Sequence, residues 1–239
     1  MDMKTSESFI RTAMLLGAES EARLLNAKVA VYGAGGVGGH CIEALARSGV
    51  GKLHIVDNDT VSESNFNRQC AATKSFLGHL KTESMKARVN EVSNAAVTTA
   101  EIFVLPNNIE SAVPPDTDFI VDAIDTVSAK IALIQYANEH NIPIISCVGM
   151  GNRLDPTEVR LGDISEVCGC PLARTLRREL KKKNILHLPV VYSREEPHAP
   201  LITVVNEHSA RPVPGSCAFV PAAAGLALAS YAVRVLCGK

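Results

Sequence analysis

The chain has 239 residues, of which 46% are hydrophobic, and its formal net charge at pH 7 is −1. This composition excludes disorder as the main state, and the length suits one large domain with a buried core. The near-neutral charge excludes nucleic-acid binding through global charge, so any such contact requires a local basic patch. Seven irregularly spaced cysteines and a polar first segment, 1–7, rather than a secretion signal predict free thiols in a reducing cytoplasm.

Residues 5–27 are predicted to form one or two amphipathic helices. Phe9 and Leu16 lie near helical spacing, and Gly17 marks a stop. Arg11 lies among them, and from the pattern alone it is a solvated surface side chain.

Residues 28–38 organise the rest of the chain. A short apolar run, 29–32, predicts a buried parallel strand, and a helical run, 40–47, follows a glycine cluster. The loop between strand and helix contains Gly33, Gly35, Gly36 and Gly38. Such glycines permit a tight turn and let backbone N–H groups at a helix N-terminus approach phosphate oxygens.

A second predicted strand, 53–56, ends in Asp57, 19 residues after Gly38. An acid at this distance binds the ribose in dinucleotide-binding units. Together the strand, glycine loop, helix and acid predict nucleotide binding. The alternative is a glycine-rich turn with no ligand.

The segment 58–69 is polar and dense in side-chain donors. Hydride transfer does not need such a cluster, whereas a triphosphate does. Arg68 can contact phosphates in a forked geometry, and Asn65 can donate hydrogen bonds to them. The alternative is a turn-rich loop, because Asn and Ser favour turns.

A helix is predicted over 73–93, entered through Gly78, with Lys81 near its start. A lysine there can contact phosphates, although most lysines in such positions are solvated.

Strands are predicted over 97–105 and 118–125, with a short helix over 107–113 between them. Asp125 then lies at the carboxyl end of a strand, where ligands bind in open α/β sheets. It fits a metal–nucleotide role or the N-cap of the next helix, predicted over 128–140, and the two roles are compatible.

A further strand is predicted over 142–148, followed by a loop over 149–157 and a short strand over 158–161. Alternating strands and helices predict an α/β fold: a Rossmann-like, doubly wound, mostly parallel sheet with helices on both faces and a C-terminal extension.

The segment 171–183 is the strongest charge feature of the chain. Its leucines repeat every four residues and predict one buried helical stripe. The remaining positions include six basic residues: Arg174, Arg177, Arg178, Lys181, Lys182 and Lys183. The pattern fits equally a solvated helix face and a contact with a phosphate backbone.

The segment 184–212 is predicted to be an irregular loop over the site, because it contains several prolines. Residues 217–237 are apolar but rich in alanine, so we expect a helix packed on the sheet and no membrane contact.

Cysteine chemistry gives no clear site. Cys168 and Cys170 resemble half of a zinc clamp, but their spacing is unusual and a second pair is missing, so no zinc is expected. Cys217 is a conceivable nucleophile without a histidine partner nearby in sequence.

These motifs jointly resemble the MoeB/ThiF/HesA superfamily of adenylating enzymes, which is related to ubiquitin-activating enzymes. The resemblance covers about residues 9–160 and rests on the glycine loop, D-N-D at 57–59, S-N-F-N-R-Q at 64–69, G-H-L-K at 78–81 and D-A-I-D at 122–125.

The resemblance implies roles for these residues. The glycine loop would bind ATP, Asp57 would hold the ribose, and phosphates would be contacted by Asn65, Arg68 and Lys81. Asp125 would serve Mg²⁺ bound to ATP, and Arg11 would cross a homodimer interface. Nucleotide-site residues are Gly33, Gly35, Gly36, Gly38, Asp57, Asp59, Asn65, Arg68, Gln69, Lys81 and Asp125; those with catalytic roles are Arg11, Arg68, Lys81 and Asp125.

A narrower resemblance covers essentially the whole chain, 1–239, as a single adenylating domain: N-terminal helices over 1–27, a nucleotide-binding core over 28–165, and the basic helix, loop and terminal helix over 166–239. R-S-G-V-G at 47–51, G-M-G-N-R-L-D-P-T at 149–157 and F-V-P-A-A-A-G at 219–225 look like the tRNA threonylcarbamoyladenosine dehydratase branch. That branch lacks the zinc clamp, as this chain does. One departure is Cys170, where the branch often has aspartate.

The narrower resemblance implies ATP-dependent cyclisation of threonylcarbamoyladenosine next to the tRNA anticodon, through an acyl adenylate. Expected cofactors are ATP and Mg²⁺, and expected partners are tRNA, bound by the basic helix, and a second copy of the chain. A cysteine-desulfurase or sulfur-acceptor partner is a further candidate.

Three other functions compete. The first is adenylation of the C-terminal glycine of a ubiquitin-like sulfur carrier, which the missing zinc pairs and the basic helix disfavour. The second is an NAD-dependent oxidoreductase, which does not need Asn65, Arg68 and Lys81. The third is a nucleotide-binding module without catalysis, favoured only if Arg68 and Asp125 lie far from the glycine loop.

Overall fold

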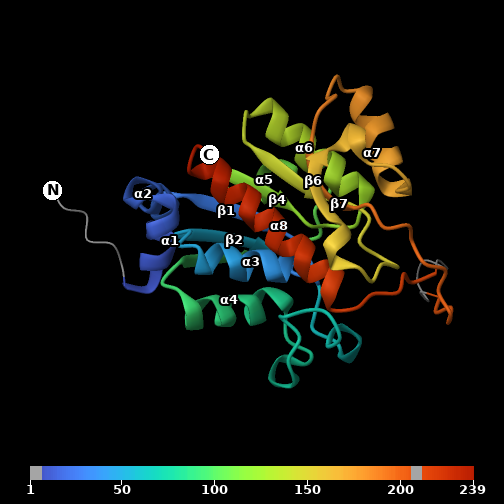
Figure 1. The fold of residues 1–239 in the computed structure, drawn as a ribbon, viewed down its shortest axis with the longest axis horizontal. Helices are drawn as coiled ribbons and strands as arrows, with labels where there is room; N and C mark the ends of the chain where they lie inside the picture. The colour runs from blue at the N-terminus through green and yellow to red at the C-terminus, as the bar shows by residue number, and fades with distance from the viewer. Residues whose placement is uncertain (1–6, 206–211) are drawn as a thin grey trace.

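A seven-stranded sheet forms the centre of the molecule (Figure 1). The computed structural model describes residues 7–205 and 212–239. The strand order is β3-β2-β1-β4-β5-β7-β6, and every neighbouring pair is parallel except β6 with β7. The strands are β1 (Lys28–Tyr32), β2 (Lys52–Val56), β3 (Ala96–Ala100), β4 (Phe119–Asp122), β5 (Ile144–Cys147), β6 (Val159–Asp163) and β7 (Pro189–Ser193). The predicted α/β fold with a mostly parallel sheet is confirmed.

Helices cover both faces of this sheet, as the alternation of side chains along β1 shows. Val29 and Val31 lie in the core beneath α3 (Gly38–Arg47) and α8 (Phe219–Leu236). Ala30 and Tyr32 lie in a second core beneath α6 (Val127–Glu139). Successive side chains of a strand point to opposite faces, so a strand buried on both faces is apolar throughout.

The other helices flank these layers. They are α1 (Ile10–Leu16), α2 (Ala18–Asn26), α4 (Lys81–Val92), α5 (Ile109–Ala112) and α7 (Pro171–Lys181), with short 3₁₀ turns at η1 (Glu7–Phe9), η2 (Glu63–Asn65), η3 (Lys74–Phe76), η4 (Pro156–Glu158) and η5 (Ile164–Glu166). The two predicted N-terminal helices are present and meet at Gly17, which has φ +90°. Along α7, Leu176 and Leu180 are buried, as the leucine spacing predicts, whereas Leu172 is only partly buried and Ala173 is buried in addition.

Several predicted boundaries are wrong. The helix predicted over 73–93 begins only at Lys81, because a 3₁₀ turn and Gly78, with φ +84°, precede it. The strand predicted to 105 ends at Ala100, and the one predicted to Asp125 ends at Asp122. Asp125 therefore lies in the loop beyond the sheet rather than in a strand.

The most serious error is in the predicted irregular loop over 184–212, of which residues 206–211 lie outside the described part of the chain. This segment contains β7, which lies inside the sheet between β5 and β6. Its residues Val190, Val191 and Tyr192 are buried. The surrounding prolines obscured a five-residue strand of the apolar kind that parallel sheets use.

Helix α8 is long and apolar enough to cross a membrane by length and composition alone. In this fold it lies across one face of the sheet next to α3 (Figure 1). Val220, Ala224 and Leu228 are fully buried in the main core. A Cβ built on Gly225 would lie 2.4 Å from the carbonyl oxygen of Val37, so the glycine permits close packing on α3.

Candidate nucleotide-binding site

The order of the strands defines a crevice at the carboxyl ends of the central strands. From β1 the chain moves outward to β2 and β3, and it then returns to β4 on the other side of β1. Ligands of doubly wound sheets bind at the carboxyl ends of the strands where the order reverses, here between β1 and β4.

The glycine loop occupies this position. Gly33 has φ +92°, and a Cβ on it would lie 2.8 Å from the carbonyl oxygen of Ala123 in the loop after β4. A Cβ on Gly38 would lie 1.7 Å from the carbonyl oxygen of Gly33, so only glycine permits this turn. Because α3 starts at Gly38, directly after this turn, the positive end of its helix dipole lies at the crevice.

Asp57 contacts this loop directly. Its Oδ2 accepts a hydrogen bond of 2.6 Å from the N–H of Ala34, and its Oδ1 accepts one of 2.8 Å from the N–H of Asp59. The carboxylate at the end of β2 is thus held beside the glycine loop, where the spacing placed it.

The polar segment 58–69 folds back over the glycine loop. Asn65 is buried, and its Oδ1 accepts a hydrogen bond of 3.1 Å from the N–H of Ser62. Arg68 is half-buried and donates to the carbonyl oxygen of Ser64 at 2.8 Å. A Cβ on Gly36 would lie 3.5 Å from the Cγ of Arg68, so the arginine and the glycine loop are in contact range.

Gln69 carries an unsatisfied polar atom at this place. Its side chain is only 8% exposed, and its Oε1 is buried with no hydrogen-bond partner among the described residues. Its Nε2 lies 3.9 Å from the position a Cβ on Gly35 would take. Buried polar groups are nearly always paired, so the orphaned oxygen beside the loop fits a ligand that donates a hydrogen bond.

Lys81 begins α4 and points back toward the same segment. Its Nζ lies 2.7 Å from Oδ2 of Asp59, and its side chain is 7% exposed. A lysine in this geometry is already desolvated and next to the crevice, unlike the solvated alternative.

Asp125 lies in the loop between β4 and α6, next to the loop after β1. Its side chain is exposed. Within 7–205 and 212–239, the hydrogen bond to its carboxylate comes from the hydroxyl of Thr126 at 3.4 Å, which leaves oxygen lone pairs free. The N-cap of α6 is Thr126 rather than Asp125, so the capping alternative is not supported.

Arg11 lies on the side of the molecule where the amino ends of the strands are. It is exposed on α1, and the neighbouring Phe9 packs 3.5 Å from a Cβ built on Gly49, which precedes the amino end of β2. The crevice lies at the carboxyl ends. Arg11 is therefore separated from the other candidate residues of its own chain.

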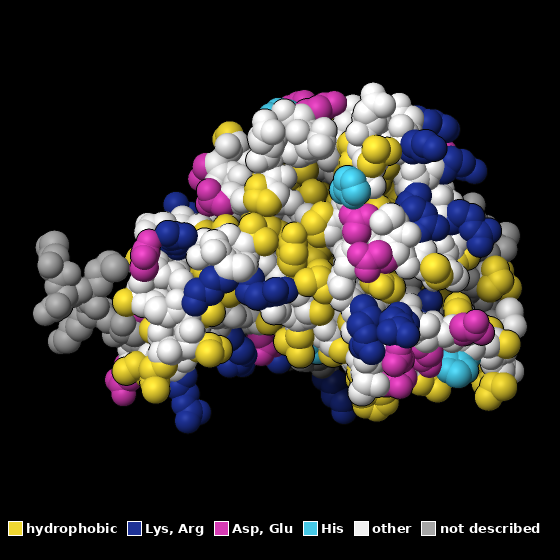
Figure 2. Space-filling view, turned by 45° about the horizontal axis from the view of Figure 1, so that its top comes forward, with side chains coloured by type: hydrophobic (Ala, Val, Ile, Leu, Met, Phe, Trp, Pro, Cys, Tyr) yellow, Lys and Arg dark blue, Asp and Glu magenta, His cyan; other side chains and the backbone are white. Residues whose placement is uncertain are grey.

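The six basic residues of 171–183 differ in their surroundings. Lys and Arg side chains gather where α7 lies (Figure 2). Arg174 and Lys181 are exposed, whereas Arg178 and Lys182 each pair with Glu179. The guanidinium of Arg177 donates to the carbonyl oxygens of Ile164 and Val167, so it connects α7 to η5.

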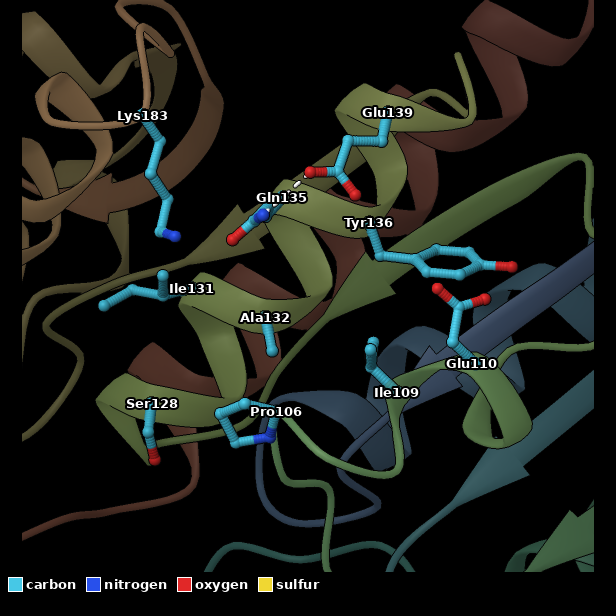
Figure 3. Close-up of a pocket in the computed structure, with 10 residues that line it drawn as sticks. All are labelled: Pro106, Ile109, Glu110, Ser128, Ile131, Ala132, Gln135, Tyr136, Glu139 and Lys183. Atoms are coloured by element: carbon cyan, nitrogen blue, oxygen red, sulfur yellow. Dashed lines mark hydrogen bonds between the residues drawn. The ribbon is translucent and has the colours of Figure 1, made fainter.

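Lys183 lies beyond the end of α7 at the rim of a shallow hollow of about 380 Å³. Figure 3 shows its amino group directed toward α6, whose residues line one side of the hollow. Glu139 lies at the end of the same helix and accepts a hydrogen bond of 2.7 Å from Gln135, whereas Glu110 comes from α5. The lining comes from α5, α6 and their flanks and contains none of the candidate nucleotide residues.

The cysteines have structural surroundings. The Sγ of Cys170 accepts a hydrogen bond of 3.4 Å from the N–H of Ala173, so Cys170 is the N-cap of α7. Aspartate is among the residues that helices generally favour at this position. Cys168 is exposed, and the Sγ of Cys217 lies 3.8 Å from the carbonyl oxygen of Arg153. Throughout the described ranges no group of three His, Cys, Asp or Glu side chains could hold a metal ion.

Two further contacts complete the crevice and were not predicted. The amide of Asn67 donates to the carbonyl oxygen of Ser216 at 2.9 Å, and a Cβ on Gly36 would lie 3.3 Å from Pro221. The N-terminal part of α8 therefore forms one wall beside the glycine loop. No local pattern signals a contact between residues this far apart in sequence.

Comparisons with known proteins agree with this geometry. The ThiF family model matches residues 9–239. A tRNA threonylcarbamoyladenosine dehydratase from Bacillus subtilis is 36% identical over 238 residues, which cover 95% of this chain and 94% of that protein. Crystal structures of the Escherichia coli tRNA N6-threonylcarbamoyladenosine dehydratase in complex with AMP and with ATP have a TM-score of 0.88 and 31% identity, covering 98% of this chain and 95% of theirs. The match over nearly the full length, together with the glycine loop and its surrounding polar residues, establishes that this chain belongs to the ThiF family.

Proposed function

We propose that this chain is a tRNA threonylcarbamoyladenosine dehydratase, which uses ATP to cyclise that modified nucleoside next to the anticodon through an acyl adenylate. The observation that carries the proposal is the position of Asp57, Arg68 and Lys81 around a glycine loop at the β1–β4 crevice, in a chain that is similar to such enzymes over nearly its full length. We also propose that residues 1–239 act as one adenylating domain.

The first chemical step is adenylation. A carboxylate oxygen of the substrate attacks the α-phosphorus of ATP, the bond to the β-phosphate bridging oxygen breaks, and pyrophosphate leaves with that electron pair. Asp57 would hold the ribose, and the glycine-loop N–H groups would contact phosphate oxygens. Arg68 and Lys81 would stabilise the negative charge that develops on the phosphates, with Asn65 donating a hydrogen bond.

The second step closes the ring. A nucleophilic atom within the modified base attacks the activated carbonyl carbon, and AMP leaves with the former carboxylate oxygen. The net change in the nucleoside is the loss of one water. Because the attacking atom belongs to the substrate, no cysteine nucleophile is needed, which agrees with the structural surroundings of Cys170 and Cys217.

Mg²⁺ would be held at Asp125. Magnesium prefers hard oxygen ligands and is usually bound through one or two carboxylates together with phosphates and waters. The exposed carboxylate of Asp125 at the crevice fits this preference, and a dedicated protein cage is not required. The ion would neutralise phosphate charge when bound.

A homodimer would bring Arg11 to a nucleotide. Arg11 lies far from the crevice of its own chain, near the amino ends of the strands. The surrounding helix exposes large apolar side chains: Ile10 is 50% exposed, Met14 82% and Leu15 81%. Such side chains are typical of interfaces. We therefore propose that Arg11 of one subunit contacts the nucleotide of its partner.

The basic side chains at and after α7 would bind the tRNA backbone. Arg174 and Lys181 are exposed, and Arg178, Lys182 and Lys183 are exposed beside them. Arg177 is the exception, since its guanidinium is engaged with backbone carbonyl groups. Because the net charge is −1, attraction to RNA requires a local basic patch, and the side chains at and after α7 supply one. We place the enzyme in the cytoplasm and retain a sulfur-relay protein as a proposed partner.

The test is direct. The protein is incubated with Mg²⁺, ATP and tRNA that carries threonylcarbamoyladenosine, the tRNA is digested, and the nucleoside is weighed. We expect the mass to fall by one water in an ATP-dependent reaction. Arg68→Ala should abolish the change, whereas Arg23→Ala, which removes the same charge from α2, should not.

An unchanged mass with wild-type protein would contradict the proposal. If an added ubiquitin-like carrier protein then stimulated pyrophosphate release, adenylation of that carrier would replace dehydration as the function.

A further inference from the structure

We propose that Asp122, Lys130 and Ser146 form a buried positioning network that holds the loop bearing Asp125 in the geometry needed for Mg²⁺ and ATP. The inference deepens the proposed function and rests on it for the role of Asp125. These three residues were not predicted to be functional; only Asp122 belongs to a motif singled out in the sequence.

The network connects three elements of the sheet layer. Asp122 is the last residue of β4, Lys130 lies on α6, and Ser146 lies on β5. The Nζ of Lys130 donates to Oδ2 of Asp122 at 2.9 Å and to the hydroxyl of Ser146 at 3.0 Å. The hydroxyl of Ser146 donates to the same carboxylate oxygen.

The second carboxylate oxygen of Asp122 faces the loop itself. Its Oδ1 accepts a hydrogen bond of 3.2 Å from the N–H of Ile124. One side chain therefore fixes the backbone directly before Asp125 and is itself held by two other elements. A carboxylate restrained at both oxygens cannot rotate without breaking a charge-assisted hydrogen bond.

The same loop also supports the glycine turn. The N–H of Ala123 donates to the carbonyl oxygen of Tyr32 at 2.8 Å, and Gly33 packs against the carbonyl oxygen of Ala123. A shift of the loop would thus move both the metal-binding carboxylate and the first glycine of the phosphate-binding turn.

Burial shows what kind of role these residues have. Asp122, Lys130 and Ser146 each have 0% exposure, so none touches a substrate, and they are positioning residues rather than catalytic ones. A buried ion pair rarely stabilises a fold more than well-packed apolar side chains would. Asp122 lies three residues before Asp125, and both of its carboxylate oxygens accept hydrogen bonds. The ion pair of Asp122 with Lys130 is therefore better explained by the fixed position that it gives to the loop before Asp125. Hydrogen-bonding partners behind a metal ligand have this effect in metal sites generally.

The test measures metal-dependent nucleotide binding rather than turnover. The affinity of the protein for a fluorescent ATP analogue is measured at increasing concentrations of Mn²⁺, which is the probe metal. The affinity for the same analogue is also measured without any metal. In Lys130→Met we expect a rise of about 10- to 100-fold in the Mn²⁺ concentration that gives half of the maximal increase in analogue binding. This is the range for loss of a hydrogen-bonding partner behind a metal ligand. Metal-free binding should change by less than about twofold, since the glycine-loop N–H groups remain.

Two variants separate positioning from general destabilisation. Leu133→Ala alters the same helix, one turn away, at a side chain that is also fully buried. It should lower the melting temperature without changing the Mn²⁺ requirement. Lys130→Arg retains the cation and should recover most of the metal dependence. If Lys130→Met does not fold, Ser146→Ala removes a single hydroxyl and should still raise the Mn²⁺ requirement several-fold.

The outcomes are distinct. An unchanged Mn²⁺ requirement in the folded Lys130→Met variant, or in Ser146→Ala if Lys130→Met does not fold, would overturn the inference, as would an equal shift in Leu133→Ala. The assay contains no tRNA, so failure of the dehydration reaction with normal metal-dependent ATP binding would reject the proposed function and leave the network standing.

Discussion

The Nζ of Lys81 lies 2.7 Å from Oδ2 of Asp59, with the lysine side chain 7% exposed and the aspartate 61% exposed. The pair keeps a desolvated ammonium group beside the crevice, and the exposed carboxylate can yield its place to phosphate oxygens. Lys81→Met should therefore lower the rate constant of ATP-dependent dehydration by about 10²- to 10³-fold, the usual loss for one charge-stabilising donor. Single-turnover kinetics would measure it. Lys86→Met, on the exposed side of the same helix, is the control and should react normally.

A comparison of Gly33 with Gly78 separates two costs of adding a side chain: the steric contact in the glycine turn and the backbone strain of a positive φ. Both have positive φ, +92° and +84°, but a Cβ on Gly78 meets nothing within 4 Å, whereas one on Gly33 lies 2.8 Å from the Ala123 carbonyl oxygen. Gly78→Ala should lower the free energy of unfolding by about 1–2 kcal/mol. Gly33→Ala should lower it by about 1–3 kcal/mol more, because the backbone must shift. Urea denaturation of both variants tests this, and equal losses would contradict the argument.

The basic residues should contribute to RNA affinity through charge. Replacement of Arg174, Arg178 and Lys181 by Gln should weaken tRNA binding and reduce the slope of log K against log salt by about 2–3, the value for three lost phosphate contacts. Filter binding over a range of KCl concentrations measures the slope. A triple replacement at Arg47, Lys52 and Lys86, which are exposed on other elements, removes equal charge and should leave the slope unchanged.

The proposed exchange of Arg11 between subunits predicts complementation. Arg11→Ala and Arg68→Ala homodimers should both be inactive. After the two proteins are unfolded together and refolded, mixed dimers contain one site with both arginines intact, so activity should recover to about one quarter of the wild-type value for random pairing in a symmetric dimer. No recovery, with mixed dimers shown by mass spectrometry, would place Arg11 outside the partner's site.

His54 should make stability depend on pH. Burial, together with the nearby positive charge of Lys28, lowers the pKa of His54 below its usual value. The unfolded chain then binds a proton more readily than the folded one, so stability is full above the unfolded pKa and falls as pH decreases toward the folded pKa. Guanidinium denaturation at pH 7.5 and pH 5.5 should show lower stability at pH 5.5. His54→Gln should reduce this difference, and an unchanged difference would assign it to other groups.

The parts of the site that could be predicted are those whose signal is local. The glycine spacing, the acid after β2 and the phosphate-contact candidate Lys81 follow from residues close together in the chain, and the structure places them at one crevice, although α4 begins later than predicted. Contacts such as Asn67 with Ser216 depend on the return of a distant segment, so no local pattern reveals them.

Three errors have simple physical causes. Strand β7 was missed because its apolar run is short and begins at a proline, although it pairs with β5 and β6. Arg177 was grouped with its basic neighbours because charge alone does not show that its guanidinium donates to the backbone carbonyl oxygens of Ile164 and Val167. The buried pair of Asp122 and Lys130 was overlooked for the opposite reason, since charged residues are normally read as exposed.

The packing of Gly225 against Val37 has a consequence for biosynthesis. The glycine turn is among the first parts of the sheet to leave the ribosome, whereas α8, which forms its wall, follows more than 180 residues later. A nascent chain therefore exposes the apolar face beneath α8 until that helix is synthesised, and it cannot assemble the complete nucleotide crevice before then. Acquisition of ATP binding should mark a late event in the maturation of the chain rather than an early one.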